Sequence, residues 1–132
     1  MTQRMSVDTL NALSNEVIGG AISVHRQLGP GLLEGAYAEC LAAELRHLDL
    51  SVRREVMVPL RYRDIVVENA YRLDLLVENK LVIEVKAAES LLSIHSAQLL
   101  TYFKLVESRL GLLMNFNVEV LHKGIKRIAN GL

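Results

Sequence analysis

Hydrophobic residues recur at helical spacing in the first third of the chain. From Val7 to Leu28 they stand three or four residues apart, which predicts a helix with a buried stripe of Leu10, Leu13, Val17, Ala21 and Val24. The Gly29-Pro30-Gly31 segment should end this helix. A second helix is predicted from Leu33 to Leu48, with an inward stripe of Tyr37, Leu41, Leu45 and Leu48.

The pattern changes to β-type residues after the second helix. The run from Val52 to Val67 predicts strands broken at Pro59 and at the Arg63-Asp64 turn. Pro59 favours a sheet edge, because proline has no N–H to donate to a neighbouring strand. Two further runs, Tyr71 to Val77 and Leu81 to Lys86, predict a β-hairpin closed by a short polar turn.

The remaining chain predicts one more helix and one buried strand. The helix should run from Ile94 to Val106, and Leu110 to Phe116 is apolar almost without interruption, which is typical of a strand covered on both faces. The tail around Ile125 and Ile128 fits a short strand or a turn. The order ααβββαβ predicts a layered α/β fold.

Length and charge narrow the possible functions. The chain has 132 residues, 51% of them hydrophobic, so we expect a single domain over residues 1–132. Lys plus Arg equals Asp plus Glu at 15 each, so any site for a polyanion must be local. The single cysteine, Cys40, is expected to be a buried, inert thiol. It cannot form an internal disulfide, and no signal-peptide or membrane-spanning segment is visible, which favours the cytoplasm and excludes a membrane partner.

The predicted hairpin gathers charged residues. If Val77 pairs with Leu81, Asp74 lies opposite Glu84. Alternation then assigns one face to Leu73, Leu75, Val77, Leu81, Ile83 and Val85, and the other to Arg72, Asp74, Glu84 and Lys86. Two carboxylates about 5 Å apart repel each other unless a cation lies between them. A divalent metal with Lys86 meets that need, and so does the alternative, a salt-bridged patch on an exposed face.

Three more polar residues are of interest because of the helix face on which each is predicted to lie. Glu34 continues the stripe of Tyr37 and Leu41, so it is expected to point inward; the alternative is a role at the helix N-terminus. Gln98 and Tyr102 are four residues apart and therefore lie on one helix face, where such residues are usually structural. No histidine or cysteine cluster has zinc spacing, and no phosphate-binding glycine loop is present.

Five sequence blocks resemble a known family. They are VHRQLGPGLLEGAY (Val24 to Tyr37), YRLDLLV with VIEVKA (Tyr71 to Ala87), IHSAQLLTY (Ile94 to Tyr102), GLLMNF (Gly111 to Phe116) and GIKRI (Gly124 to Ile128). In this order they resemble the PD-(D/E)XK nuclease superfamily, and more closely its small branch of GxxExxY proteins. One departure is that Leu73 stands where the superfamily motif has its proline.

The resemblance implies a restriction-endonuclease-like fold, a central mixed β-sheet flanked by helices, and a metal-dependent nuclease. Glu34, Asp74, Glu84 and the backbone carbonyl of Val85 would hold one or two Mg²⁺ or Mn²⁺ ions, since hard oxygen ligands suit these metals. Lys86 would orient water or neutralise the transition state, and Gln98 and Tyr102 would form a Q-x3-Y element. The implied catalytic set is Glu34, Asp74, Glu84, Lys86, Gln98 and Tyr102.

Nucleic acid, with DNA favoured over RNA, is the implied partner. Its backbone would be held by local cations, namely Arg53, Arg54, Arg61, Arg63, Arg72 and Lys104. Zero net charge argues against avid binding by a monomer, which a homodimer or a larger complex would overcome. The main alternative is a catalytically inactive nuclease-fold protein that binds nucleic acid or a protein partner. A purely structural dimerisation module would leave the charged face without a purpose.

Overall fold

The computed structural model describes residues 6–105 and 108–131. Helices α1 (Val7–Leu28) and α2 (Glu34–His47) come first, and they are followed by strands β1 (Val52–Tyr62), β2 (Ile65–Val77) and β3 (Leu81–Lys86). After these come α3 (Ser93–Phe103), β4 (Leu110–Asn115), the short 3-10 helix η1 (Leu121–Gly124) and β5 (Ile125–Ala129). The predicted order ααβββαβ is confirmed, and the tail contains both a helical turn and a strand. Val106, the predicted end of α3, lies outside the described residues.

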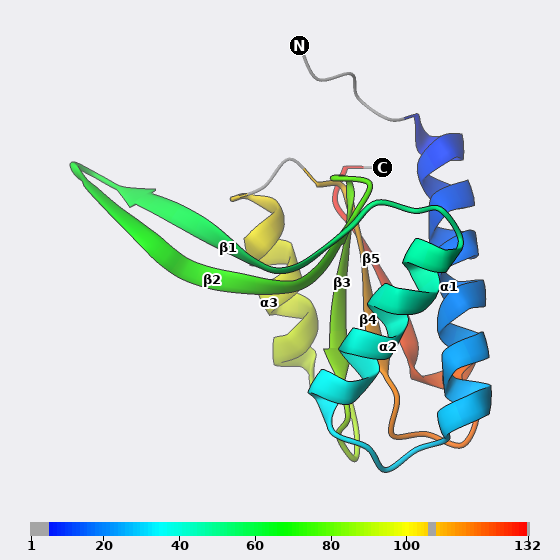
Figure 1. Ribbon diagram of the computed structural model, residues 1–132. Coiled ribbons are helices and arrows are strands. Elements are labelled where there is room, and N and C mark those ends of the chain that lie inside the picture. Colours follow the sequence, from blue (N-terminus) through cyan, green and yellow to red (C-terminus); the bar gives the residue numbers. More distant parts are fainter. Residues whose placement is uncertain (1–5, 106–107, 132) are drawn as a thin grey trace.

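The five strands form one mixed sheet in the order β1-β2-β3-β4-β5. Only β3 and β4 run parallel; the other neighbouring pairs are antiparallel. Helices α1 and α2 cover one face and α3 covers the other (Figure 1). Strand β4 is buried along its whole length, as expected for a central strand covered on both faces. Pro59 lies in β1, which is an edge strand of the sheet, as predicted.

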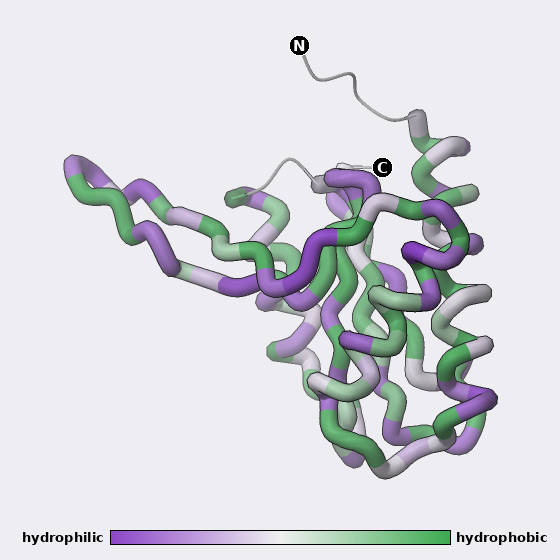
Figure 2. The backbone as a smooth tube through the Cα atoms, viewed as in Figure 1, coloured by the Kyte–Doolittle hydropathy of each residue, from purple (hydrophilic) through white to green (hydrophobic). Residues whose placement is uncertain are grey.

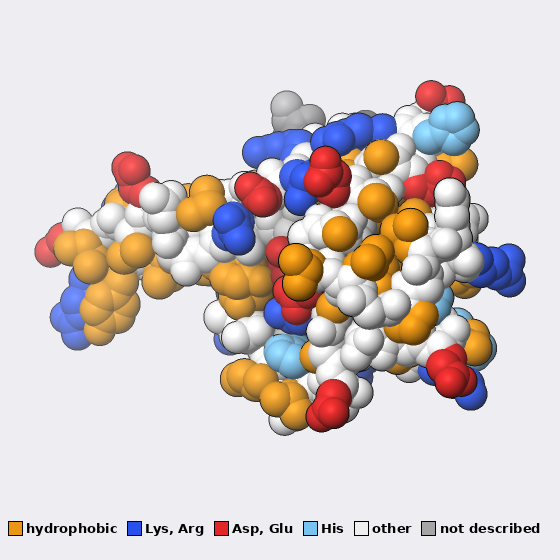
Figure 3. Space-filling view, turned by 60° about the horizontal axis from the view of Figure 1, so that its bottom comes forward, with side chains coloured by type: hydrophobic (Ala, Val, Ile, Leu, Met, Phe, Trp, Pro, Cys, Tyr) orange, Lys and Arg blue, Asp and Glu red, His pale blue; other side chains and the backbone are white. Residues whose placement is uncertain are grey.

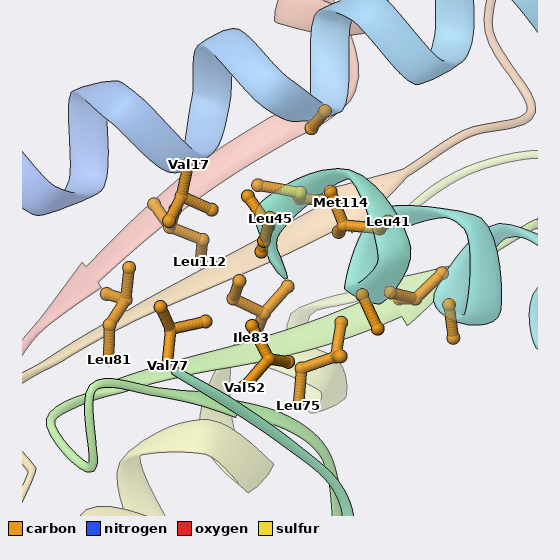
Figure 4. Packing of buried hydrophobic residues seen from close by; sticks show 14 of the residues in the cluster. Val17, Leu41, Leu45, Val52, Leu75, Val77, Leu81, Ile83, Leu112 and Met114 are labelled. Atoms are coloured by element: carbon orange, nitrogen blue, oxygen red, sulfur yellow. The ribbon is translucent and has the colours of Figure 1, made fainter. Parts of the chain in front are cut away.

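The larger hydrophobic core lies between the sheet and the helices α1 and α2. All five residues of the predicted α1 stripe are buried there, and α2 contributes Tyr37, Leu41 and Leu45 (Figure 4). The stripe of α2 ends one turn early, because Leu48 lies past the last helical turn and is 37% exposed. Cys40 is exposed, so the predicted buried thiol is wrong: it lies on the outer side of α2, next to the buried Leu41.

The ends of α1 follow from its flanking residues. Ser6 is the N-cap and its hydroxyl accepts a hydrogen bond from the backbone N–H of Thr9 at 3.1 Å. Gly29 ends the helix with φ 71°, a conformation that glycine adopts without strain. Within the described residues no helix is both long and apolar enough to cross a bilayer.

A smaller core joins α3 to the opposite face of the sheet, and Gly111 is where they meet most closely. A Cβ at Gly111 would lie 2.5 Å from Leu99 Cδ2 and 2.8 Å from Phe103 Cζ. Gly111→Ala should therefore lower the free energy of unfolding by about 1 to 3 kcal/mol. Urea denaturation measures this change. The matched control is Gly19→Ala in α1, where a Cβ meets nothing within 4 Å and alanine should stabilise the helix. Equal stability of the two variants would contradict this packing.

Strands β1 and β2 extend far beyond the rest of the sheet (Figure 1). We call residues 57–70 the arm. The predicted break at Pro59 is wrong: a register shift between Val58 and Leu60 accommodates it within a continuous β1. Likewise β2 runs without interruption from the turn at residues 63–64 into the predicted hairpin. Residues 59–70 are all exposed, and Figure 2 shows hydrophobic residues mixed with hydrophilic ones along the arm.

Candidate active site

The pairing of β2 with β3 stops where the charged residues begin. The ladder contains the predicted Val77–Leu81 pair and ends at Leu75–Ile83, one position before Asp74 and Glu84 would meet. Instead, Asp74 Oδ2 accepts a hydrogen bond from the backbone N–H of Val85 at 2.8 Å. In a continuing ladder, a backbone carbonyl of β2 would accept a hydrogen bond from this N–H of β3. Here the side chain of Asp74 accepts it instead.

The same position interrupts the pairing of β2 with β1. Regular pairs surround Asp74 on both sides, Arg54 with Leu75 and Val56 with Leu73, but Glu55 and Asp74 themselves are unpaired. Glu55 has φ 52°, which is uncommon for a residue with a side chain. Both strands therefore carry an irregularity of the kind that β-bulges produce at the rims of sheets.

This irregularity reverses the alternation of side chains. Leu75 and Val77 pack with α1 and α2, whereas Leu73 packs with α3. The prediction that Leu73 shares a face with Leu75 is wrong for this reason. Arg72 is likewise moved off the Glu84 face: with Glu34 and Arg54 it lines a hollow beside α2, which Asp74 also reaches.

Glu84 lies deep in the sheet on the α3 side. It is only 4% exposed, and its neighbours along β3, Ile83 and Val85, point to the opposite core. Burial, followed by the charge of nearby Asp74, raises the pKa of Glu84 to about 8. Hydrogen bonding from Tyr71 and the charge of Lys86 act in the opposite direction. The sheet therefore brings Asp74, Glu84 and Lys86 together, as the sequence predicted.

Tyr71 joins this group and was missed by sequence reasoning. Its ring stacks on that of Tyr102 with 18° between the planes, and burial is the main cause that raises the pKa of both phenols. Regular alternation along β2 would put Tyr71 on the face away from Glu84, so only knowledge of the irregularity at Asp74 would have revealed it. Tyr102 is 8% exposed, whereas Gln98, one turn earlier on α3, is exposed.

Glu34 occupies a different place from the one predicted. It is exposed at the first residue of α2, and its Oε1 accepts a hydrogen bond from the backbone N–H of Ala87 at 3.3 Å. The spacing of Glu34 from Tyr37 and Leu41 predicted that its side chain points into the core. At the first turn of α2, however, the side chain faces the loop that follows β3 rather than the core. Glu34 thus contacts the segment directly after Lys86 and lines the hollow that contains Asp74.

A sequence profile of the PD-(D/E)XK nuclease superfamily matches residues 11–128. The chain belongs to the PD-(D/E)XK nuclease superfamily. Its mixed five-stranded sheet with helices on both faces is consistent with the restriction-endonuclease-like fold. The match covers every element whose side chains form the group around Glu84. Neither a curated protein nor a solved structure matches the chain.

PD-(D/E)XK nucleases generally use divalent metals such as Mg²⁺, and two observations test whether this chain fits one. Glu84 Oε1 is buried without a hydrogen-bond partner, and Asp74 lies within hydrogen-bonding reach of Glu84. A hard cation would satisfy both carboxylates. Among the described residues, however, no three Asp, Glu, His or Cys side chains gather as a ready ligand set. The pair still fits Mg²⁺, which is usually bound by one or two carboxylates and several waters.

The segment after Lys86 is fixed by β4, a feature that the superfamily motif alone does not indicate. The carbonyl of Lys86 accepts a hydrogen bond from the backbone N–H of Phe116 at 2.8 Å. The side chain of Asn115, which is 2% exposed, binds both the N–H and the carbonyl of Ala88, at 3.1 and 2.9 Å. The sequence does single out Asn115, because it is a polar residue at the end of an otherwise apolar strand.

The cations predicted to contact nucleic acid fall into separate groups. Arg54 and Arg72 line the hollow beside Asp74, and Arg53 is exposed on the adjoining part of β1. Lys104 is exposed at the C-terminus of α3. Arg61 and Arg63 lie at the outer end of the arm, where the Arg63 guanidinium is 5.7 Å from the centre of the Tyr62 ring. Arg54 and Arg72 thus share a hollow with Asp74, a residue of the superfamily motif.

Proposed function

We propose that this protein is a metal-dependent nuclease that hydrolyses phosphodiester bonds in DNA. The observation that carries the proposal is the carboxylate pair of half-buried Asp74 and buried Glu84, with one oxygen of Glu84 unpartnered and Lys86 beside it. Two carboxylates and a lysine at the interruption of the sheet are what a metal-assisted attack of water on a phosphate needs. Membership of a nuclease superfamily supports this chemistry.

Asp74 and Glu84, with the carbonyl of Val85, are the proposed ligands of Mg²⁺ or Mn²⁺. When bound, the ion would activate water and offset negative charge on the phosphate. The hydrogen bond from the Val85 N–H orients Asp74 before any ligand arrives. Glu84 must lose its proton to act as a ligand, and the Tyr71 hydroxyl favours the ionised form by donating to it.

The remaining proposed catalytic residues act around this pair. Lys86 would orient the attacking water or neutralise charge as the phosphate becomes pentacovalent. Tyr102 and Gln98 would donate hydrogen bonds to the phosphate, and Tyr102 is the better placed because it stacks on Tyr71. Glu34 would enter the ligand set through water, since its carboxylate already accepts from Ala87 N–H.

DNA would enter from the side of the hollow beside α2. Arg54 and Arg72 line it next to Asp74, and Arg54 Nε is buried without a hydrogen-bond partner. Two guanidinium groups so placed suit the phosphates that flank the scissile bond. Arg53 and Lys104 would extend this contact, while Arg61 and Arg63 on the arm would reach more distant phosphates.

Three finer assignments complete the proposal. The GLLEGAY segment at residues 31–37 supports placement in the GxxExxY branch. The equal numbers of acidic and basic residues favour action as a homodimer or within a larger complex, because a neutral monomer attracts DNA weakly. A single cysteine is in keeping with a single-domain protein of the cytoplasm.

A cleavage assay tests the function. Purified protein with Mg²⁺ or Mn²⁺ should cut single-stranded, double-stranded or branched DNA, and EDTA should abolish cutting. RNA of the same sequence is the control for substrate class. Binding of DNA without cleavage under every metal condition would favour an inactive nuclease-fold protein, for which the lack of a third clustered ligand is the supporting observation. If the protein neither binds nor cleaves DNA, the proposed nuclease is overturned, and the inactive nuclease-fold protein would have to bind a protein partner instead.

A further inference from the structure

The arm carries a hydrophobic stripe that the rest of the described chain leaves exposed. Leu60, Tyr62, Ile65 and Val67 are 37, 60, 58 and 41% exposed. They form two cross-strand pairs, Leu60 with Val67 and Tyr62 with Ile65, so all four side chains point to one face of the arm. Figure 3 shows hydrophobic side chains gathered along the arm out to its end.

This stripe continues the smaller core outward. Val58 and Tyr71 are paired at the base of the arm, and both pack with α3 on the sheet face that this helix covers. Leu60 lies two residues after Val58, and Val67 four residues before Tyr71, so alternation on both strands assigns the stripe to the α3 side of the sheet across the register shift. Within residues 6–105 and 108–131 no third strand pairs with the arm beyond its base, since β3 pairs with β2 only from Leu75 to Val77, and residues 59–70 are all exposed. A two-stranded hairpin alone is marginally stable in water.

The charges of the arm identify the kind of partner. Arg61 and Arg63 are balanced by Asp64 and Glu68, and the whole chain is also neutral. A neutral arm has no field that would draw it to a polyanion, and it can lie against a second copy of this neutral chain without net repulsion. A large exposed apolar stripe with balanced charges is typical of a protein–protein contact.

The size of the arm indicates where on a second copy it binds. A standard interface engages about 20 to 30 residues from each partner. The arm over residues 57–70 is smaller than that, so it must reach the body of the other molecule. On the same side of the sheet, α3 exposes a ridge of Ile94, Ala97 and Leu100, spaced three residues apart, with Ile94 55% and Leu100 41% exposed. A partner placed on this side meets both surfaces.

We infer that the protein forms a two-fold dimer in which the arm of each subunit lies across the outer face of α3 of the other. In such an arrangement the stripe of each subunit packs on the α3 ridge of the other. One two-fold axis therefore buries both exposed surfaces of both subunits. The arm thereby gains the covering layer that it lacks in the single chain.

Sedimentation equilibrium of the whole chain in EDTA tests the dimer without reference to cleavage or metal. The wild type should have twice the 14.7 kDa mass of one chain at micromolar concentration. Tyr62→Ser with Ile65→Ser should raise the dimer dissociation constant by about 30-fold or more. The matched control is Val66→Ser, which removes an equally exposed side chain, 51%, from the opposite face of the arm and should leave the mass unchanged.

Leu100→Ser tests the receiving surface, and it should weaken the dimer as the arm variant does. In a Cys40→Ser background, Tyr62→Cys on one subunit should form a disulfide with Leu100→Cys on the other. A wild type that stays monomeric at 100 times the expected concentration would overturn the inference, as would a dimer insensitive to Leu100→Ser, which would mean that arms pair with arms. A monomer whose arm variant loses DNA affinity would overturn it in favour of a nucleic-acid contact.

Discussion

Replacing Lys86 with alanine should lower the rate of DNA cleavage by about 100- to 1000-fold, the usual loss when one preorganised donor to a developing charge is removed. Lys86 lies two residues after Glu84 on β3, and its charge acts directly on that carboxylate. The carbonyl of Lys86 is bound by the Phe116 N–H, so the backbone should hold its place when the side chain is shortened. Single-turnover cleavage with saturating Mn²⁺ measures the effect on the chemical step.

The control for this variant must separate chemistry from metal binding. Lys86 lowers the pKa of Glu84, so its removal also makes the ligand harder to ionise. The wild-type and variant cleavage rates are therefore compared over rising pH, at the plateau of each, where Glu84 is ionised in both proteins. Lys126→Ala removes an exposed lysine from β5 and should cut at the wild-type rate. If Lys86→Ala cuts as fast as Lys126→Ala, the assignment of Lys86 is wrong.

Without divalent metal, the free energy of unfolding should fall as the pH rises from about 4.5 to 8. The pKa of Glu84 is about 8 in the folded protein, whereas its ordinary value is 4.5. Between pH 4.5 and 8 the folded state therefore binds this proton more tightly than the unfolded state does. The stabilisation from the protonated carboxyl is complete below pH 4.5 and is lost as the pH approaches 8. The slope is at most about 1.4 kcal/mol per pH unit. Urea denaturation at several pH values in EDTA measures it.

Metal should reverse this dependence, because it replaces the proton. Titration of Mg²⁺ into the protein at pH 7, in buffers of different ionisation enthalpy, should release about one proton per ion. Glu84→Gln should abolish both the proton release and the pH slope, while Tyr71→Phe, which removes a donor to the ionised carboxylate, should extend the slope above pH 8. An unchanged slope in Glu84→Gln would show that another group titrates.

The helices and the central strands could be predicted because their signals are local. The α1 stripe and its glycine end, and the apolar run of β4, are each set by residues within the element. The arm could not be predicted as one continuous hairpin. Its residues beyond Val58 are exposed on both faces, so no alternation of buried and exposed positions marks it. Pro59 suggested a break, but a register shift accommodates it.

The candidate site was predicted in part, and the reason lies in two residues. Alternation along regular strands brought Asp74 to the face of Glu84, and the two are indeed close. The irregularity at Glu55 and Asp74 then placed Tyr71 near Glu84 and Arg72 beside α2. Neither strand has a glycine or proline at this position to indicate the irregularity. Glu34 was misplaced because helical phase carries no information where a first turn extends past the core.

The hydrogen bond between Asp74 and the backbone of Val85 gives Asp74 a structural role in addition to its proposed role as a metal ligand. The side chain of Lys86 does not have this structural role. A variant that loses Asp74 altogether would leave a strand donor unmatched and weaken the sheet, whatever happens to catalysis. Asp74→Asn keeps an oxygen at that place and should separate folding from chemistry. In a descendant that no longer cleaves DNA, we expect Asp74 to be retained because the fold needs it, whereas Lys86 could be substituted. Lys86 is therefore the better indicator of whether a related chain is still an enzyme.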